Sequence, residues 1–214
     1  MPNAEEEKRV AAEAAAALVP RGATVGLGTG STVELLLPVL AGLDLGLRCV
    51  ATSPRTEGAA RALGLEVEPF LTLDRVDIAI DGADQVDPAG WIIKGGGGAH
   101  TREKIVALAA ERFVVIVSSD KLVPKLEPPV PLELLEYGVQ ATLRALREAS
   151  LRESPPSPDG GLIADYHATF EDPAELSVHL STTPGVVDHG LFPAELVSEV
   201  IVGEGSTART IKIT

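Results

Sequence analysis

Short apolar runs alternate along the first part of this chain with segments whose composition favours helices. The first run, residues 23–27, leads through a glycine-rich turn into a helix predicted over residues 33–40. Further strands are predicted at residues 47–52, 76–80, 91–93 and 113–117. Alternating strands and helices are typical of a parallel sheet that is covered by helices on both faces. We therefore expect an α/β fold with a doubly wound, mostly parallel, Rossmann-like sheet.

The composition changes near residue 124, where four prolines lie within residues 124–131. Beyond them we expect, in order, a helix over 132–149, a loop over 154–161, a strand over 162–166, a helix from 172, and strands at 186–187 and 200–202. This order is typical of a smaller α+β subdomain. The predicted division gives residues 1–127, with about 204–214, to an α/β catalytic domain and residues 128–203 to the subdomain.

The charge balance limits the classes of ligand. The chain has 18 Lys and Arg residues against 31 Asp and Glu residues, a net charge of −13. Such a surface repels the phosphates of nucleic acids, so we expect no nucleic-acid partner. A phosphate site in this chain would depend on helix N-termini and on a few well-placed lysines.

Other features predict a cytoplasmic protein with no bound metal. No apolar run reaches the roughly 20 residues that span a bilayer, and three glutamates near the N-terminus replace the basic start of a signal peptide. The single cysteine, Cys49, excludes an intrachain disulfide. The four histidines lack metal-ligand spacing and are expected to be ordinary surface or packing residues.

The glycine-rich turn at residues 26–32 is the first candidate site. A dinucleotide fingerprint would need glycine at position 31, where this chain has Ser31, and a Walker A loop would need a lysine. What remains is a small phosphate cradle at a helix N-terminus, with the hydroxyls of Ser31 and Thr32. The alternative is a plain tight turn in which Ser31 caps the helix and forms a capping box with Glu34.

Charged side chains follow three other predicted strands. Asp81 and Asp84 come after the strand at 76–80, where an α/β sheet binds ligands, although both could be turn formers. Lys94 precedes four glycines, which suit close approach of the backbone to a ligand. Glu103 lies in the first turn of a helix predicted over 102–112 and capped by Thr101; the helix N-terminus is expected to favour its ionised form. Lys121 either binds phosphate or only flanks a loop.

These motifs occur together and in a fixed order. They are GLGTGST at 26–32, DGAD at 81–84, KGGG at 94–97, REK at 102–104, SDK at 119–121, PGVV at 184–187 and GLF at 190–192. The set closely resembles the ribose-5-phosphate isomerase A family and covers nearly the whole chain.

The resemblance implies interconversion of D-ribose 5-phosphate and D-ribulose 5-phosphate through an enediolate, in the non-oxidative pentose phosphate pathway. It implies Glu103 as the base, Lys94 as the enediolate stabiliser, Asp81 in ring opening and Asp84 in handling hydroxyl protons. The sugar phosphate would be held by Thr29, Gly30, Ser31, Thr32, Gly82, Ala83, Gly95, Gly96, Gly97 and Lys121. The family requires no cofactor, and it suggests a homodimer or a dimer of dimers.

Two other classes share this fold. A nucleotide-dependent oxidoreductase is disfavoured by Ser31 and by the missing acidic residue after the second strand. A sugar-phosphate sensor attached to a transcription regulator would need a DNA-binding domain, for which the residues before the first strand are too few. It would also have little reason to keep Asp81, Asp84, Lys94 and Glu103 together.

Overall fold

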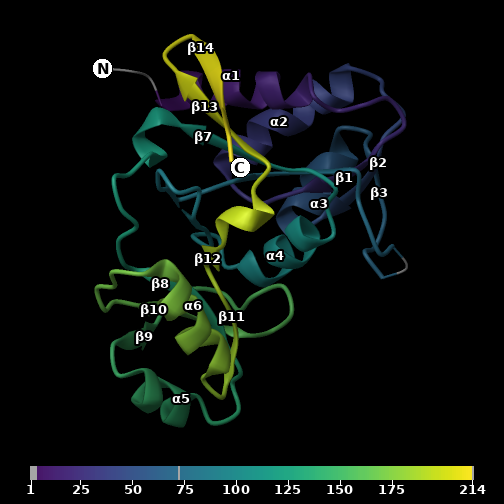
Figure 1. Cartoon of the computed structure of the whole chain (residues 1–214). Coiled ribbons are helices and arrows are strands. Elements are labelled where there is room, and N and C mark those ends of the chain that lie inside the picture. The colour runs from purple at the N-terminus through teal and green to yellow at the C-terminus, as the bar shows by residue number, and fades with distance from the viewer. Residues whose placement is uncertain (1–3, 72, 214) are drawn as a thin grey trace.

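A seven-stranded sheet is the centre of the larger part of the molecule (Figure 1). The structure is a computed structural model that describes residues 4–71 and 73–213. Across the sheet the strands are β14 (Thr207–Lys212), β13 (Glu199–Glu204), β7 (Phe113–Ser118), β4 (Ile78–Gly82), β1 (Thr24–Leu27), β2 (Arg48–Ala51) and β3 (Glu66–Val67). All neighbours are parallel except β13 and β14. The predicted mostly parallel α/β sheet is confirmed.

Helices cover both faces of this sheet. Its central strands are apolar on both sides, as in β7, where every residue is buried. Val114 and Ile116 of β7 pack in one core with α1 (Ala4–Ala16) and α2 (Ser31–Gly42), and α3 (Pro54–Ala62) lies on the same face. Val115 and Val117 point to the other face and pack with α4 (His100–Leu108). Alternate residues of one strand thus enter separate cores, because successive side chains point to opposite faces. Among the described helices, none is long and apolar enough to cross a membrane.

The second part is built on an antiparallel sheet of four strands. Its order is β11 (Val186–His189), β8 (Val130–Leu134), β10 (Leu162–Tyr166) and β9 (Ala149–Leu151), with helices α5 (Val139–Leu146) and α6 (Pro173–Thr182). Residues from these elements form a core of their own. A small sheet of β12 (Leu191–Phe192), β6 (Ile92–Ile93) and β5 (Gln85–Val86) also contributes Ile93 and Leu191 to that core.

The helix predicted over residues 132–149 is wrong in its first half. Residues up to Leu134 belong to β8, and the helix covers only Val139–Leu146. Leu132, Glu133 and Leu134 are all buried, because β8 lies inside the four-stranded sheet between β11 and β10. Gly138 precedes the helix in the left-handed region, at φ 73°.

The chain returns to the large sheet earlier than expected. The predicted second boundary, about residue 204, falls at the end of β13, which already belongs to the seven-stranded sheet. A boundary before Glu199 therefore follows the sheets better. The division of the chain into two parts stays a prediction.

Candidate active site

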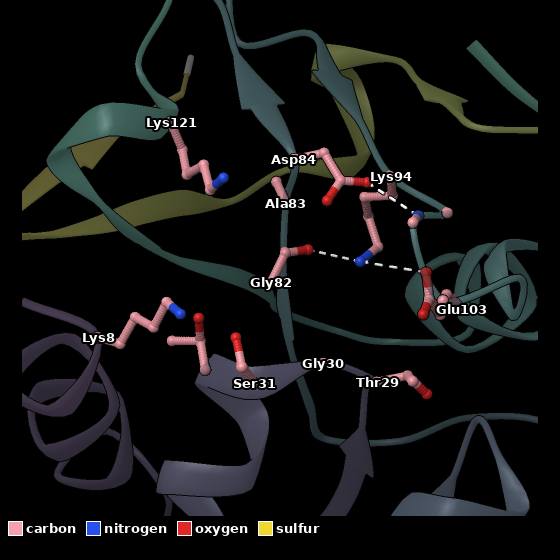
Figure 2. A pocket seen from close by; sticks show the side chains of 14 residues that line it. Lys8, Thr29, Gly30, Ser31, Gly82, Ala83, Asp84, Lys94, Glu103 and Lys121 are labelled. Carbon is pink, nitrogen blue, oxygen red and sulfur yellow. Dashed lines mark hydrogen bonds and ion pairs between the residues drawn. The ribbon is translucent and has the colours of Figure 1, made fainter. Parts of the chain in front are cut away.

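The carboxyl ends of β1 and β4 and the turn after β7 border one cavity of about 210 Å³ (Figure 2). Parallel strands present their carboxyl ends at the same edge of a sheet, which is where such folds bind ligands. Of the predicted site residues, all but Asp81 line this cavity: Thr29, Gly30, Ser31, Thr32, Gly82, Ala83, Asp84, Lys94, Gly95, Gly96, Gly97, Glu103 and Lys121. The structure adds Lys8, which the sequence analysis missed.

Lys94 is the centre of a buried charge cluster. Its Nζ donates a hydrogen bond to the Gly82 carbonyl oxygen at 2.5 Å and lies 2.9 Å from Asp81 Oδ2. Glu103 Oε2, from the first turn of α4, lies 3.2 Å from the same nitrogen. The three side chains are no more than 4% exposed. Burial alone would lower the pKa of Lys94, but the carboxylates of Asp81 and Glu103 raise it above its ordinary value.

Glu103 holds a proton more tightly than an ordinary glutamate. Burial, reinforced by the negative charge of Asp81, raises its pKa to about 8, although Lys94 acts in the opposite direction. The net shift of the Glu103 pKa is therefore opposite to the one expected from the helix N-terminus, because removal from water outweighs a dipole effect of about 1 kcal/mol. Glu103 Oε2 is close to Lys94 but has no aligned hydrogen-bond donor among the residues described. It remains free to accept a proton.

Asp81 lies beneath the cavity rather than in its wall. Its Oδ1 accepts hydrogen bonds from the backbone N–H groups of Gly82 at 2.7 Å and Thr29 at 3.1 Å. Burial raises its pKa and Lys94 opposes this. A Cβ at Gly28 would come within 1.9 Å of Asp81 Cγ, so position 28 has no room for a side chain. Asp81 therefore joins the turn after β1 to Lys94.

Asp84 and the glycine run at residues 95–97 form another part of the cavity wall. Asp84 is exposed to the cavity and accepts a hydrogen bond from the Gly96 N–H at 3.0 Å. Gly95 has a φ of 110°, and a Cβ there would come within 2.8 Å of both His100 Nδ1 and Pro131 Cβ. The glycine at this position is thus required by the backbone conformation and by the packing beneath it.

The other end of the cavity is suited to an anion. Ser31 and Thr32 are the first residues of α2, whose unpaired N–H groups give this end a partial positive charge. The residue that caps this helix is Gly30, with no side-chain hydrogen bond, so the predicted capping box of Ser31 and Glu34 is wrong. Figure 2 shows the side chains of Lys8 and Lys121 extending toward the same space as the Ser31 hydroxyl.

Lys8 is placed by its neighbour in α1. The Glu7 carboxylate is buried and accepts hydrogen bonds from the Ser119 N–H and hydroxyl and from the Gly205 N–H. It ties α1 to the turn that carries Lys121. A sequence signal existed, because Glu7 shares the buried face of the helix with Ala11 and Ala15 at a spacing of four residues. A carboxylate on such a face indicates a specific polar partner.

Two further polar residues of α4 lie beside Glu103 in sequence, and neither of them lines the cavity. Thr101 does not cap α4, which starts after Ala99; its hydroxyl donates to Glu133 at 2.5 Å. His100 is fully buried, and burial lowers its pKa to about 3. Within residues 4–71 and 73–213, no group of three or more His, Cys, Asp or Glu side chains is arranged to hold a metal ion.

Comparison with known proteins places this geometry in a family. The family model for ribose 5-phosphate isomerase A (phosphoriboisomerase A) matches residues 48–207. The ribose-5-phosphate isomerase A of Thermosynechococcus vestitus is 43% identical over 92% of this chain and 91% of its own length. The crystal structure of the Neisseria gonorrhoeae isomerase A superposes with a TM-score of 0.95 at 32% identity, covering 100% of this chain and 99% of the other.

A further solved structure, a D-ribose-5-phosphate isomerase in complex with phospho-erythronic acid, gives a TM-score of 0.92 at 32% identity. It covers 98% of this chain and 99% of the other. Sequence and structure thus agree over nearly the full length. The chain belongs to the ribose 5-phosphate isomerase A family.

Proposed function

We propose that this chain is an aldose–ketose isomerase that interconverts D-ribose 5-phosphate and D-ribulose 5-phosphate in the non-oxidative pentose phosphate pathway. The observation that carries the proposal is the layout of the cavity. One end holds Lys94 beside Glu103, and the other holds Lys8, Lys121 and the N-terminus of α2. A small sugar phosphate needs both ends: one for its reacting carbons and one for its phosphate. The names of the related proteins support the same activity.

Glu103 is the proposed base. In the open-chain aldose it takes the proton from C2 on its free Oε2, and the C2–H electron pair becomes the double bond of the enediolate. The C1 oxygen takes up the negative charge. The proton then returns from Glu103 to C1, which uses the electron pair of the enediolate double bond. The C2 hydroxyl passes its proton to the C1 oxygen, so that C2 becomes the new carbonyl and C1 carries the hydroxyl. The reaction moves protons and electron pairs within one molecule and consumes no oxidant.

Lys94 is the proposed stabiliser of the enediolate. In the free site its ammonium donates a hydrogen bond to the Gly82 carbonyl oxygen and pairs with the carboxylates of Asp81 and Glu103. When Glu103 takes the substrate proton, its negative charge disappears, and the positive charge of Lys94 is then available to the developing oxyanion. A donor aimed at such an oxygen contributes about 10²–10³ in rate.

Asp84 suits the handling of hydroxyl protons better than Asp81 does. Asp84 faces the cavity, whereas the Asp81 carboxylate is buried and engaged by Lys94, Thr29 and Gly82. We therefore propose that Asp84 assists ring opening and that Asp81 holds Lys94 in place. This differs from the role that the family resemblance implied for Asp81.

The phosphate is proposed to lie between Lys8 and Lys121, against the hydroxyls of Ser31 and Thr32 and the free N–H groups of α2. Thr29, Gly30, Gly82, Ala83, Gly95, Gly96 and Gly97 complete the wall around the sugar.

A coupled assay for ribulose 5-phosphate formed from ribose 5-phosphate, run in EDTA, tests this proposal. We expect turnover to survive chelation, since the proposed steps use side chains alone. Loss of activity that a divalent ion restores would contradict this mechanism. Binding of ribose 5-phosphate with no turnover would favour the alternative, a sugar-phosphate sensor of related fold.

We also propose that the enzyme works in the cytoplasm as a homodimer or a dimer of dimers. The exposed apolar side chains Ile105 and Leu108 on α4 support an association surface, and Cys49 is a free thiol, as suits a reducing compartment. Light scattering of the purified chain measures the assembly, and a monomer at micromolar concentration would contradict that part.

A further inference from the structure

Arg152 connects the second part of the molecule to the wall of the cavity. It follows β9, and its guanidinium forms a bidentate pair with Asp165 of β10, at 2.9 Å from Nε to Oδ2 and 2.5 Å from Nη2 to Oδ1. The remaining nitrogen, Nη1, donates to the carbonyl oxygens of Gly95 at 3.1 Å and Gly96 at 3.0 Å. Arg152 is not among the residues that line the cavity.

The glycine run that Arg152 contacts depends on backbone hydrogen bonds for its shape, among them one from the Lys94 N–H to Gly190 and one from the Gly98 N–H to Gly95. Residues 94–99 belong to no helix or strand, and the glycines carry no side chains that could anchor them. The Gly96 residue is therefore held from two sides. Its N–H donates to Asp84, and its carbonyl oxygen accepts from Arg152. The hydrogen bonds of one glycine thus link Arg152 to the carboxylate that faces the substrate.

We infer that Arg152 is a positioning residue for the reaction: by holding the Gly95 and Gly96 carbonyls it fixes the glycine run that orients Asp84. The inference rests on the proposed function of the cavity. The geometry of the active-site wall then depends in part on the four-stranded sheet, because Asp165 lies in β10 and Arg152 directly follows β9.

The chemistry of the guanidinium explains why arginine suits this place. Its planar fork can serve a carboxylate with two nitrogens while a third reaches two carbonyl oxygens. A lysine ammonium is a compact point charge that lacks this geometry. The Asp165 carboxylate neutralises the charge of Arg152, so the role we assign is fixed geometry rather than attraction of the substrate phosphate.

The test compares Arg152→Met and Arg152→Lys with a matched control, Arg102→Met. Arg102 forms the same kind of bidentate pair, with Asp159 at 2.7 and 2.6 Å, and also joins the two parts of the fold, but it does not contact the glycine run. Two probes separate the ends of the cavity: phospho-erythronic acid, which carries a phosphate and a hydroxy-acid chain and so has groups for both ends, and inorganic phosphate, which has a group for the phosphate end alone. Amide hydrogen exchange of the peptide covering residues 94–99 reports on the glycine run directly.

For Arg152→Met we expect the Kd of phospho-erythronic acid to rise and kcat/KM to fall by about tenfold each, with the phosphate Kd within about twofold of wild type. Exchange in residues 94–99 should become faster. Arg152→Lys should recover little of the loss, and Arg102→Met should resemble wild type in all four measurements.

Unchanged exchange and unchanged phospho-erythronic acid binding in Arg152→Met would overturn the inference. Equal weakening of both probes together with a lower Tm would overturn it as well, since that pattern indicates a general structural role. Inactive wild-type protein would instead overturn the proposed function. The hydrogen-exchange and binding measurements would still test whether Arg152 fixes the glycine run, because they do not depend on turnover.

Discussion

Glu103 Oε2 lies 3.2 Å from Lys94 Nζ and yet has no aligned hydrogen-bond donor among the described residues. The ammonium therefore acts on this oxygen mainly through its charge. Burial raises the pKa of Glu103, and a nearby cation keeps the ionised form accessible. A carboxylate oxygen with a raised pKa and no committed donor is suited to accept a proton from carbon, because its basicity is not used up by other bonds.

Replacing this carboxylate tests the base directly. Glu103→Gln keeps the shape of the side chain but removes the proton acceptor, so kcat should fall by about 10²–10⁴ with KM little changed. Solvent-exchange labelling at C1 and C2 follows the carbon-bound proton itself. Glu111→Gln, at an exposed pair with Arg75 beyond the same helix, is the control and should leave both readouts unchanged. Exchange at a near wild-type rate in Glu103→Gln would assign the base elsewhere.

The pH dependence follows from the pKa of Glu103, raised to about 8. Only the ionised form accepts a proton, so kcat/KM should fall about tenfold for each pH unit below that value and level off above it. The profile is best measured between about pH 7 and pH 10, because the substrate phosphate itself titrates near pH 6. A profile that is flat across pH 8, or that falls as the pH rises, would contradict this assignment.

Most of the cavity could be predicted from the sequence because its residues follow strand ends. The turns at Gly30 and Gly82 follow β1 and β4 and leave the parallel sheet at one edge. The glycine run after Lys94 instead follows β6 of the small antiparallel sheet, so the strand predicted at residues 91–93 is not part of the parallel sheet. Lys8 was missed because it comes from a helix that precedes the first strand. Its approach to the site depends on the contacts of Glu7 with a turn more than a hundred residues away.

The pKa of Glu103 was beyond sequence reasoning for a similar reason. The helix position of this residue is local, but its burial and its distance to Asp81 arise only when β4, β6 and α4 pack together. The strand β8 was missed for a related reason. Leu132, Glu133 and Leu134 are all buried by the neighbouring strands and by partners of Glu133, so their sequence lacks the clear alternation of a half-buried strand.

The two lysines at the phosphate end are expected to act on binding rather than on chemistry. Lys8→Ala and Lys121→Ala should each raise KM by about tenfold while changing kcat less, since a phosphate contact acts equally in the ground and transition states. The loss should shrink with unphosphorylated ribose. Lys125→Ala, which removes an exposed pair with Glu171, is the control. A proportional loss with both sugars would remove the lysine concerned from the phosphate site.

Glu7 gives a prediction about stability. Its hydrogen bonds from Gly205 and Ser119 lower its pKa below the ordinary 4.5. A lowered pKa in the folded state stabilises the fold at pH values above 4.5, and this stabilisation is lost as the pH falls through the folded-state pKa. Glu7→Gln should lower the free energy of unfolding by about 1–3 kcal/mol at neutral pH.

Urea unfolding at pH 7 and in the acid range measures this effect, and the difference in the free energy of unfolding between wild type and Glu7→Gln should narrow as the pH falls below 4.5. Glu13→Gln, on an exposed position of the same helix, is the control. A constant difference across the pH range would show that the charge of Glu7 is not its source.

Asp84 and Asp81 can be separated by the direction of the reaction. Ribose 5-phosphate is largely a closed ring, so it must open before the C2 proton can leave, whereas ribulose 5-phosphate lacks a closed furanose form. If Asp84 assists opening, Asp84→Asn should slow the aldose direction more than the ketose direction when substrate is limiting and ring opening is slow. Asp81→Asn should slow both directions about equally, because it removes a charge that holds Lys94. Stopped-flow measurements that start from each sugar phosphate give the rates in the two directions. If Asp81→Asn slowed mainly the aldose direction and Asp84→Asn slowed both directions equally, Asp81 would be the residue that assists ring opening and Asp84 the one that holds Lys94.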